Sequence, residues 1–406
     1  MRKCVGLFFS LSFVLIVCSC SNDLIKEQKD GLELADSYKL SIQEAQKLVL
    51  DFVNMDSQTK NGSSLDFSGC KMHYCQVKST SSITKSGSNS NESIPVYELL
   101  LKKDEKDGFA LVVGDKRVQQ VLAYSEDGSL NDTTFNLGLK SFVRSIPAHI
   151  DAKLEEYMNY SVETNCNLNT KAEDPSKDMY THYLPLNVSW GQNSPYNNMI
   201  PYSCSNNDAS YGGKAPAGCA AVAVAQLMSY YKSLPTYNWN LLLTSSKITQ
   251  TDSEERKNEV ARLMYNVGQD LFINYSCDGS GASSDMIKSV LTNYGYTVNQ
   301  IRLLTDGPKE IRADRPMLVI GYCNAGGHAW LIDGLRYHTS LHPLGQYRQY
   351  QYYSMNWGWN GSSDGQYLVF DVVYGSTSGT MNPIQPTGRP SNYEFNRDIK
   401  VYSVSR

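Results

Sequence analysis

The sequence predicts an α+β fold made of two modules, each combining helices with antiparallel strands. Three observations support this prediction: helical spacing of apolar residues near the N-terminus, short alternating strands in both halves, and a change of composition near the middle. All five tryptophans and the glycine-rich clusters lie at or after residue 190. With 406 residues, 41% of them hydrophobic and 19% charged, the chain is long enough for two or three packed domains.

Residues 1–19 have the pattern of an export signal, with a charged start and an apolar stretch too short to span a bilayer. The segment VCSC that ends at Cys20 resembles the lipobox of bacterial lipoproteins. We therefore expect export, a precursor anchored to a bacterial membrane through a lipid on Cys20, and a polar tether at residues 20–40. Ordinary secretion with an unmodified Cys20 is the alternative.

The first module is predicted to begin with a helix at residues 41–55, because Ser41 and Glu44 form a capping-box pattern ahead of apolar residues at helical spacing. The Ser/Asn-rich stretch at residues 79–93 is typical of a loop. Three short strands are predicted at residues 96–101, 109–113 and 119–124. Together these elements predict a small α+β unit at residues 41–170.

A polar, turn-rich stretch around residues 160–180 has the composition of a linker that a processing protease can reach. We place the domain boundary there, so that the second module covers residues 171–406. This module is predicted to be rich in helices before residue 295 and rich in strands from residue 317 onward. Cleavage near Lys171 or Lys177 would separate the two modules.

Cys219 follows a Gly/Ala turn and opens an apolar helical run at residues 220–232. The unpaired amides and positive dipole end of a helix N-terminus favour the thiolate, which is the nucleophilic form of cysteine. A base must take up the thiol proton, and His328 follows a glycine pair at the head of a short apolar strand. Either residue alone would more often be structural, but a cysteine followed later by a histidine is the order of papain-type enzymes.

An orienting group for the imidazole is expected from Asn356, whose amide closes a strand that would pair with the histidine's strand. Trp357 would shield that hydrogen bond from water. Asp333 lies five residues after His328 and points to the opposite strand face, so it is badly placed for this role. Gln192, on a segment fixed by a tryptophan and a proline, is the candidate donor to the oxyanion of a tetrahedral intermediate.

Four segments of the second module resemble the streptopain family of papain-like cysteine peptidases. They are WGQNSPYN at residues 190–197, GCAAVAVAQ at 218–226, GGHAWLIDG at 326–334 and NWGW at 356–359. The resemblance implies a papain-like fold, with a helical part and an antiparallel sheet, and hydrolysis of peptide bonds. The roles that it implies are nucleophile for Cys219, general base and acid for His328, oxyanion donor for Gln192, and support of the histidine for Asn356 and Trp357.

The resemblance also covers a Gly/Ser loop at residues 277–284, where Ser280 would line the substrate cleft, and Gly327, whose backbone would contact substrate. Residues 109–117 and 121–125 resemble the propeptide of the family. This implies a zymogen whose own propeptide is an intramolecular inhibitor until it is cut off. A mature peptidase without the lipid anchor would then be released.

The expected partners are protein or peptide substrates, and no cofactor is expected. A net charge of −4 and a pI near 5.9 give no basic patch of the kind that nucleic-acid binding requires. His338 and His342 have a spacing that suits a metal pair, but Pro343 argues against the helix that would align them. We therefore expect neither a metal site nor a nucleic-acid partner.

Three classes of function stay open at this point: an endopeptidase, an acyltransferase or amidase with the same fold and the same Cys–His pair, and a non-enzymatic surface binding protein. The ten cysteines leave the disulfides undetermined. If Cys4 and Cys18 leave with the signal, Cys20 carries the lipid and Cys219 stays reduced, the candidates for pairing are Cys70, Cys75, Cys166, Cys204, Cys277 and Cys323.

Overall fold

The computed structural model describes residues 32–54, 65–78, 91–131, 136–164, 180–204, 212–323, 326–341, 347–369 and 397–406. The predicted export signal, Cys20, Cys166, His342 and the proposed cleavage region at residues 171–177 lie outside these ranges. Within the ranges, no helix combines the length and the apolar character needed to cross a membrane.

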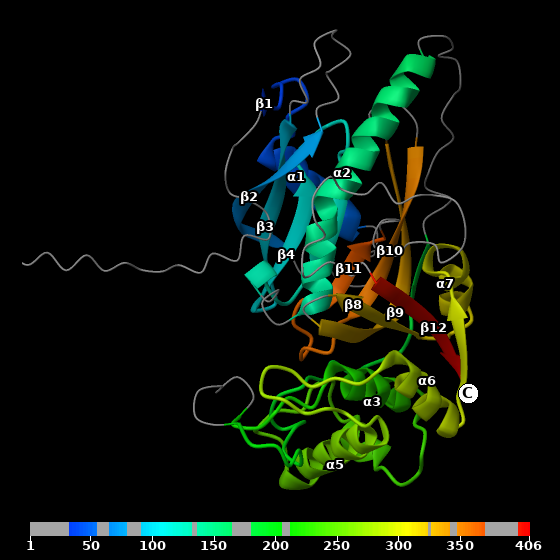
Figure 1. Ribbon diagram of the computed structural model, residues 1–406. Helices are drawn as coiled ribbons and strands as arrows, with labels where there is room; N and C mark the ends of the chain where they lie inside the picture. The colour runs from blue at the N-terminus through cyan, green and yellow to red at the C-terminus, as the bar shows by residue number, and fades with distance from the viewer. Residues whose placement is uncertain are drawn as a thin grey trace, which may run out of the picture.

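The N-terminal module, residues 32–164, is a mostly antiparallel sheet with two helices packed against it (Figure 1). Its elements are β1 (Leu32–Glu33), α1 (Ile42–Asn54), β2 (Asp66–Lys78), β3 (Asn91–Lys103), β4 (Lys106–Val113), β5 (Val121–Ser125) and α2 (Leu137–Thr164). The three predicted strands are confirmed as β3, β4 and β5. Strand β2 and the long helix α2 are additional elements that the sequence did not reveal.

Helix α1 begins where the capping box predicts. The Ser41 hydroxyl accepts a hydrogen bond from the Glu44 amide at 3.2 Å, and the Glu44 carboxylate accepts one from the Ser41 amide at 2.7 Å. One face of the helix buries Ala45, Val49 and Phe52. The predicted helix is therefore confirmed. Phe52 on its buried face also contacts Tyr352 of the C-terminal module.

The C-terminal module, residues 180–406, has a helical part and a sheet part (Figure 1). The helical part contains α3 (Cys219–Tyr231), α4 (Trp239–Leu242), α5 (Glu254–Asp270) and α6 (Ser284–Asn293). The sheet part contains β6 (Tyr180–Tyr183), β7 (Thr297–Ile301), α7 (Leu303–Arg312), β8 (Met317–Cys323), β9 (Gly326–Leu341), β10 (Tyr347–Asn356), β11 (Gly365–Leu368) and β12 (Arg397–Ser405). This order confirms the predicted change from helices to strands and the predicted α+β class.

Helix α3 is the centre of the helical part. All its residues from Ala220 to Ser229 are buried, and α5 and α6 pack against it. A disulfide between Cys204 and Cys277 joins two loops of the same part. Among the cysteines whose side chains the structure describes, Cys70, Cys75 and Cys219 are free.

The two modules share one continuous sheet, whose strand order is β1-β3-β4-β5-β11-β10-β9-β8-β12-β7. The join is the antiparallel pair β5 and β11, in which Tyr124 faces Gln366 and Ala123 faces Tyr367. Strand β11 would otherwise be a sheet edge with unpaired backbone groups. Removal of the N-terminal module must therefore break this ladder of backbone hydrogen bonds.

Aromatic packing reinforces the join between the modules. Phe52 lies edge-on to Tyr352 with ring centroids 4.9 Å apart, and Phe142 lies edge-on to Tyr367 at 5.0 Å. The Tyr352 hydroxyl donates to the Val121 main-chain oxygen at 2.6 Å. A single hydrophobic core consequently runs from the N-terminal module into one face of the C-terminal sheet.

Candidate active site

Cys219 is the first residue of α3, and its position depends on the glycine before it. Gly218 has a φ of 93°, a left-handed backbone conformation that favours glycine. A β-carbon at Gly218 would also lie 3.1 Å from the main-chain oxygen of Ser280 and 3.1 Å from Ile273 Cδ1. The turn therefore places the thiol at a helix N-terminus with the Ser280 loop directly beside it.

Two opposing effects act on the pKa of the Cys219 thiol. Burial raises its pKa above the ordinary value of a cysteine, although hydrogen bonds from the amides of Ala329, Ala220 and Cys219 itself act to lower it. The amides of the helix N-terminus act toward the thiolate, as expected, but desolvation of the buried sulfur outweighs them, so the net shift of the pKa favours the thiol.

His328 lies on β9, with three indole rings nearly parallel to its own. The ring centroids of Trp330, Trp357 and Trp359 lie 5.7, 6.4 and 6.4 Å away. The Nε2 atom lies 3.1 Å from the main-chain oxygen of Trp357. Because a carbonyl oxygen can only accept, Nε2 carries the hydrogen and Nδ1 keeps its lone pair for a proton. Burial lowers the His328 pKa to about 4, so the imidazole is neutral.

The predicted oxyanion donor lies next to the nucleophile turn. Gln192 is buried, and its main-chain oxygen accepts a hydrogen bond from the Ala217 amide at 2.9 Å, two residues before Cys219. In the described part of the chain, no hydrogen bond joins the side chains of Cys219 and His328. The structure thus brings the three predicted residues into one region without engaging the Cys–His pair.

Asn356 does not orient the imidazole in this structure, which corrects the prediction. Its Oδ1 accepts hydrogen bonds from Gln226 Nε2 at 3.0 Å and from the Gly358 amide at 3.2 Å, and its Nδ2 donates to the Val188 main-chain oxygen at 2.7 Å. The acceptor for the His328 Nε2 hydrogen is the main-chain oxygen of Trp357, where the side-chain amide of Asn356 was predicted. The side chain of Trp357 lies over the histidine as predicted.

Ser280 lies near the turn before Cys219, and Gly327 directly precedes His328. Ser280 is buried, and its hydroxyl accepts a hydrogen bond from the Ser276 amide at 3.4 Å. Gly327 pairs with Tyr322 on β8. A β-carbon on Gly327 would lie 2.8 Å from the Tyr322 ring, so the strand approaches this aromatic closely because residue 327 has no side chain.

The first turn of α2 covers the histidine, a feature that the sequence did not reveal. A β-carbon at Gly138 would overlap the indole of Trp357 and lie 3.0 Å from His328 Cδ2. The neighbouring Leu137 lies near Gly326, where a β-carbon would be 3.6 Å from Leu137 Cδ1. The N-terminal module therefore closes the site through a helix that contacts the histidine and its tryptophan.

A buried carboxyl group supports the backbone of Trp357. Asp364 Oδ1 accepts a hydrogen bond from the Trp357 amide at 2.8 Å. Burial raises the pKa of Asp364 to about 8; Asp333 and Asp127 raise it as well, while Lys247 and the Trp357 amide lower it. Burial also raises the pKa of Asp333 to about 6. Asp364 is consequently protonated at neutral pH.

Replacing Asp364 with asparagine is expected to change how stability depends on pH. Folding raises the Asp364 pKa from an ordinary value of about 3.9 to about 8, so its contribution is complete below about pH 4 and is lost as the pH rises toward about 8. Asparagine keeps an acceptor for the Trp357 amide but does not ionise. In thermal melts, the full Cys219→Ser chain is compared with the same chain carrying Asp364→Asn. The stability that Asp364→Asn adds should increase as the pH rises, by roughly 1 kcal/mol per pH unit at most. A difference that stays constant across this range would contradict the assignment.

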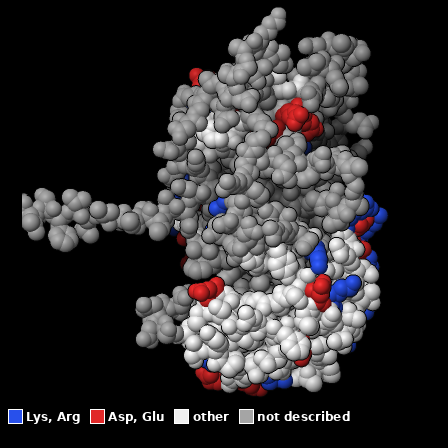
Figure 2. Space-filling model, viewed as in Figure 1, with Lys and Arg blue, Asp and Glu red and all other residues white. Residues whose placement is uncertain are grey.

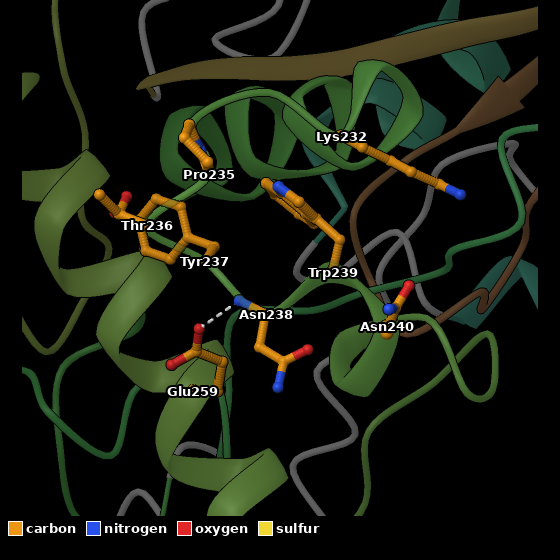
Figure 3. Close-up of a pocket in the computed structure, with 8 residues that line it drawn as sticks. All are labelled: Lys232, Pro235, Thr236, Tyr237, Asn238, Trp239, Asn240 and Glu259. Atoms are coloured by element: carbon orange, nitrogen blue, oxygen red, sulfur yellow. Dashed lines mark hydrogen bonds between the residues drawn. The ribbon is translucent and has the colours of Figure 1, made fainter.

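A surface hollow of about 540 Å³ lies on the helical part of the module (Figure 3). It is lined by Lys232, Pro235, Thr236, Tyr237, Asn238, Trp239, Asn240 and Glu259. The Asn238 amide donates to the Glu259 carboxylate at 2.7 Å, and none of the predicted site residues lines the hollow. In Figure 2 the charged side chains on the visible face of this part lie mainly near its edges.

The expectation that His338 and His342 form no metal site cannot be tested fully on the described residues. These residues contain no group of three or more His, Cys, Asp and Glu side chains that could hold a metal ion. His338 packs against Phe52, with ring centroids 5.1 Å apart. Because His342 lies outside the described residues, the absence of a metal site stays a prediction.

Known proteins resemble this chain in sequence and in structure. Streptopain from Streptococcus pyogenes is 26% identical over 317 residues, which cover 67% of this chain and 74% of streptopain. The thiol protease/hemagglutinin PrtT of Porphyromonas gingivalis is 24% identical over 319 residues, covering 66% of this chain and 33% of PrtT. Prointerpain A from Prevotella intermedia is 20% identical, with a TM-score of 0.46 over 82% of this chain and 98% of that one. Active interpain A is 23% identical, with a TM-score of 0.39 over 58% and 98% of the chains.

Matches to protein families cover both modules. Residues 37–150 match the family described as Spi protease inhibitor. Residues 190–235 and 232–367 match the Peptidase C10 family, and these ranges include Cys219, His328 and the other predicted site residues. The chain is a streptopain-like cysteine peptidase, whose C-terminal module matches the Peptidase C10 family and whose N-terminal module matches the Spi protease inhibitor family.

Proposed function

We propose that Cys219 is the nucleophile of this cysteine peptidase and that His328 is its general base and acid. The observation that carries the proposal is that the main-chain amide of Ala329, which directly follows His328, lies close enough to the Cys219 thiol to lower its pKa. The nucleophile helix and the histidine strand therefore meet at the sulfur. Rotation of the imidazole about its side-chain bonds would direct Nδ1 toward the thiol.

In the proposed reaction, His328 accepts the thiol proton and Cys219 Sγ attacks the carbonyl carbon of a peptide bond. The Cys219 amide and the Gln192 side chain donate hydrogen bonds to the resulting oxyanion. The imidazolium gives its proton to the departing amine, which leaves a thioester on Cys219. Water then attacks the thioester as His328 accepts its proton, and that proton returns to the sulfur as the acid product leaves.

The other predicted residues have supporting roles in this proposal. The main-chain oxygen of Trp357 holds the imidazole Nε2–H and its indole shields this bond, while Asn356 fixes the segment that carries the oxygen. Ser280 and the backbone of Gly327 line the substrate cleft. These assignments are supported by the contacts of each residue around Cys219 and His328.

We propose that the full chain is a latent zymogen, with an inhibitory domain at residues 41–170 and a peptidase at residues 171–406. The packing of Gly138 on Trp357 and His328 supports this, as does the protonation of the pair. A neutral imidazole beside a protonated thiol lacks the ion pair that activates a cysteine. Cleavage near residues 171–177 would separate the two domains.

We propose that the precursor is exported through residues 1–19 and anchored by a lipid on Cys20. The lipobox-like sequence supports this, and the anchor would stay with the propeptide when the peptidase is released. In a bacterial host, the wild-type precursor should partition into the membrane fraction with an N-terminal mass that includes acyl chains, and Cys20→Ala should leave that fraction. An unmodified N-terminus at Cys20 would contradict the proposal.

The reaction class is tested with the trimmed protein, a peptide substrate and an excess of a free amine. Hydrolysis gives a fragment with a new carboxyl group, whereas an acyltransferase gives the amine adduct and a binding protein gives neither product. Cys219→Ser and His328→Ala should each lower kcat/KM by roughly 10⁴-fold. Mass spectrometry of the products distinguishes all three functions in one experiment.

A further inference from the structure

Gln226 is a buried amide inside an otherwise mostly apolar helix. From Ala220 to Ser229, the residues of α3 are buried, and Gln226 and Ser229 are the polar side chains among them. Gln226 has no exposed surface. Burial of an amide is costly unless hydrogen bonds satisfy it, so the partners of this side chain indicate what it does.

The two ends of the Gln226 amide bind two different segments of the site. Its Oε1 accepts a hydrogen bond from the Trp190 amide at 2.9 Å, two residues before Gln192. Its Nε2 donates to Asn356 Oδ1 at 3.0 Å, one residue before Trp357. One side chain on the nucleophile helix thus contacts both the oxyanion segment and the segment that holds the imidazole.

We propose that Gln226 is a positioning residue for the reaction, a proposal that rests on the function assigned above. It fixes the Gln192 and Trp357 segments to the helix that begins at Cys219. Because Asn356 Oδ1 already accepts from Gln226 and from the Gly358 amide, the Trp357 main-chain oxygen is left as the acceptor for His328. Gln226 therefore acts on the histidine through the segment of Asn356.

Other contacts join the same two segments and should keep the fold intact without Gln226. The main-chain amide of Asn360 donates to the Trp190 main-chain oxygen at 3.1 Å. The side-chain Nδ2 of Asn360 donates to Asn193 Oδ1 at 2.7 Å. These bonds lie beside the segments and do not reach α3. Without the Gln226 amide, we therefore expect the chain to fold, but the Gln192 and Trp357 segments to be held less firmly in position against α3.

The test compares Gln226→Glu and Gln226→Leu with wild type after trimming, using kcat and KM for one peptide across pH. Glutamate can accept from the Trp190 amide, but it can donate to Asn356 only when protonated. The ratio of Gln226→Glu kcat to wild-type kcat should be low at neutral pH and rise toward one in acid, with little change in KM. Gln226→Leu should lower kcat by roughly 10- to 100-fold at every pH.

Ser229→Ala is the matched control, because this buried hydroxyl of the same helix donates to the Gln226 main-chain oxygen at 2.7 Å and not to another segment. Its kcat should equal that of wild type. Rates are normalised to reactive Cys219, counted by irreversible labelling, so that misfolded protein does not enter the comparison. A Gln226→Glu ratio that does not depend on pH would overturn the proposal, as would a wild-type rate in Gln226→Leu. Inactive trimmed wild type would instead overturn the proposed function itself.

Discussion

Replacing Gly138 with alanine is expected to make the untrimmed chain react with thiol reagents. Alanine is favoured over glycine in a helix by about 1 kcal/mol, so the change alone should stabilise α2. In the structure, however, the added methyl group would overlap Trp357 and press on His328. Overpacking of this kind costs about 1–3 kcal/mol, which would raise the population of the uncovered site by roughly 5- to 150-fold.

This result is measured as the rate of Cys219 labelling in full chains with an intact linker. Glu155→Ala, at an exposed position of the same helix, is the control and should label as slowly as wild type. If Gly138→Ala is as unreactive as wild type and equally stable, the contact between α2 and the histidine does not maintain latency.

Trimming the chain is expected to shift the reactivity of Cys219 to lower pH. In the full chain burial raises the thiol pKa and lowers the His328 pKa to about 4, so both groups are neutral near pH 7. Removal of α2 returns water to the histidine, which raises its pKa and allows an imidazolium to pair with a thiolate. An activated cysteine of this type has a pKa of about 3.5–7.5, so alkylation near pH 6 should accelerate by roughly 100-fold or more.

The measurement is the rate of alkylation by iodoacetamide from about pH 4 to about pH 10, before and after trimming, with Cys219 followed by peptide mass mapping. His328→Ala in the trimmed protein should return the apparent thiol pKa toward that of an ordinary cysteine. Identical pH profiles before and after trimming would show that the N-terminal module does not control the ionisation of the pair.

Local sequence signals predicted where two helices begin, one of them the helix that carries the nucleophile. A capping box needs only Ser41 and Glu44, three residues apart, and both of its hydrogen bonds form. The start of α3 at Cys219 likewise follows from a glycine turn followed by an apolar helical run. In each case the determining contacts lie within one turn of the residue, so the sequence carries them directly.

Contacts between distant segments could not be predicted in this way. Asn356 has the residue type of an imidazole partner, but the choice between His328 and Gln226 depends on where α3 lies beside β10. The role of Gly138 depends on the docking of α2, and a helical glycine gives no signal of what lies opposite it. The same limit applies to the pairing of Cys204 with Cys277, which are separated by 73 positions in the sequence.

Strand pairing across the modules was also outside the reach of the sequence. The residues of β5 and of β11 each have the pattern of a strand. Either strand could equally form the edge of a sheet within its own module, so the sequence does not indicate that the two strands pair. Strand β2 was missed because the alternation of polar and apolar side chains in its sequence, DFSGCKMHYCQVK, changes phase between Tyr74 and Cys75. Its pairing with β3 along nearly its full length supplies the order that the pattern does not show.

The most direct test of a latent cysteine peptidase is labelling with an irreversible epoxide inhibitor of papain-like peptidases. Full and trimmed chains of wild type and Cys219→Ser are treated and compared by intact mass. We predict one adduct on trimmed wild type, little or none on the full chain, and none on either form of Cys219→Ser. A folded, trimmed wild type that takes up no inhibitor, or a full chain that labels as fast as the trimmed one, would contradict the account.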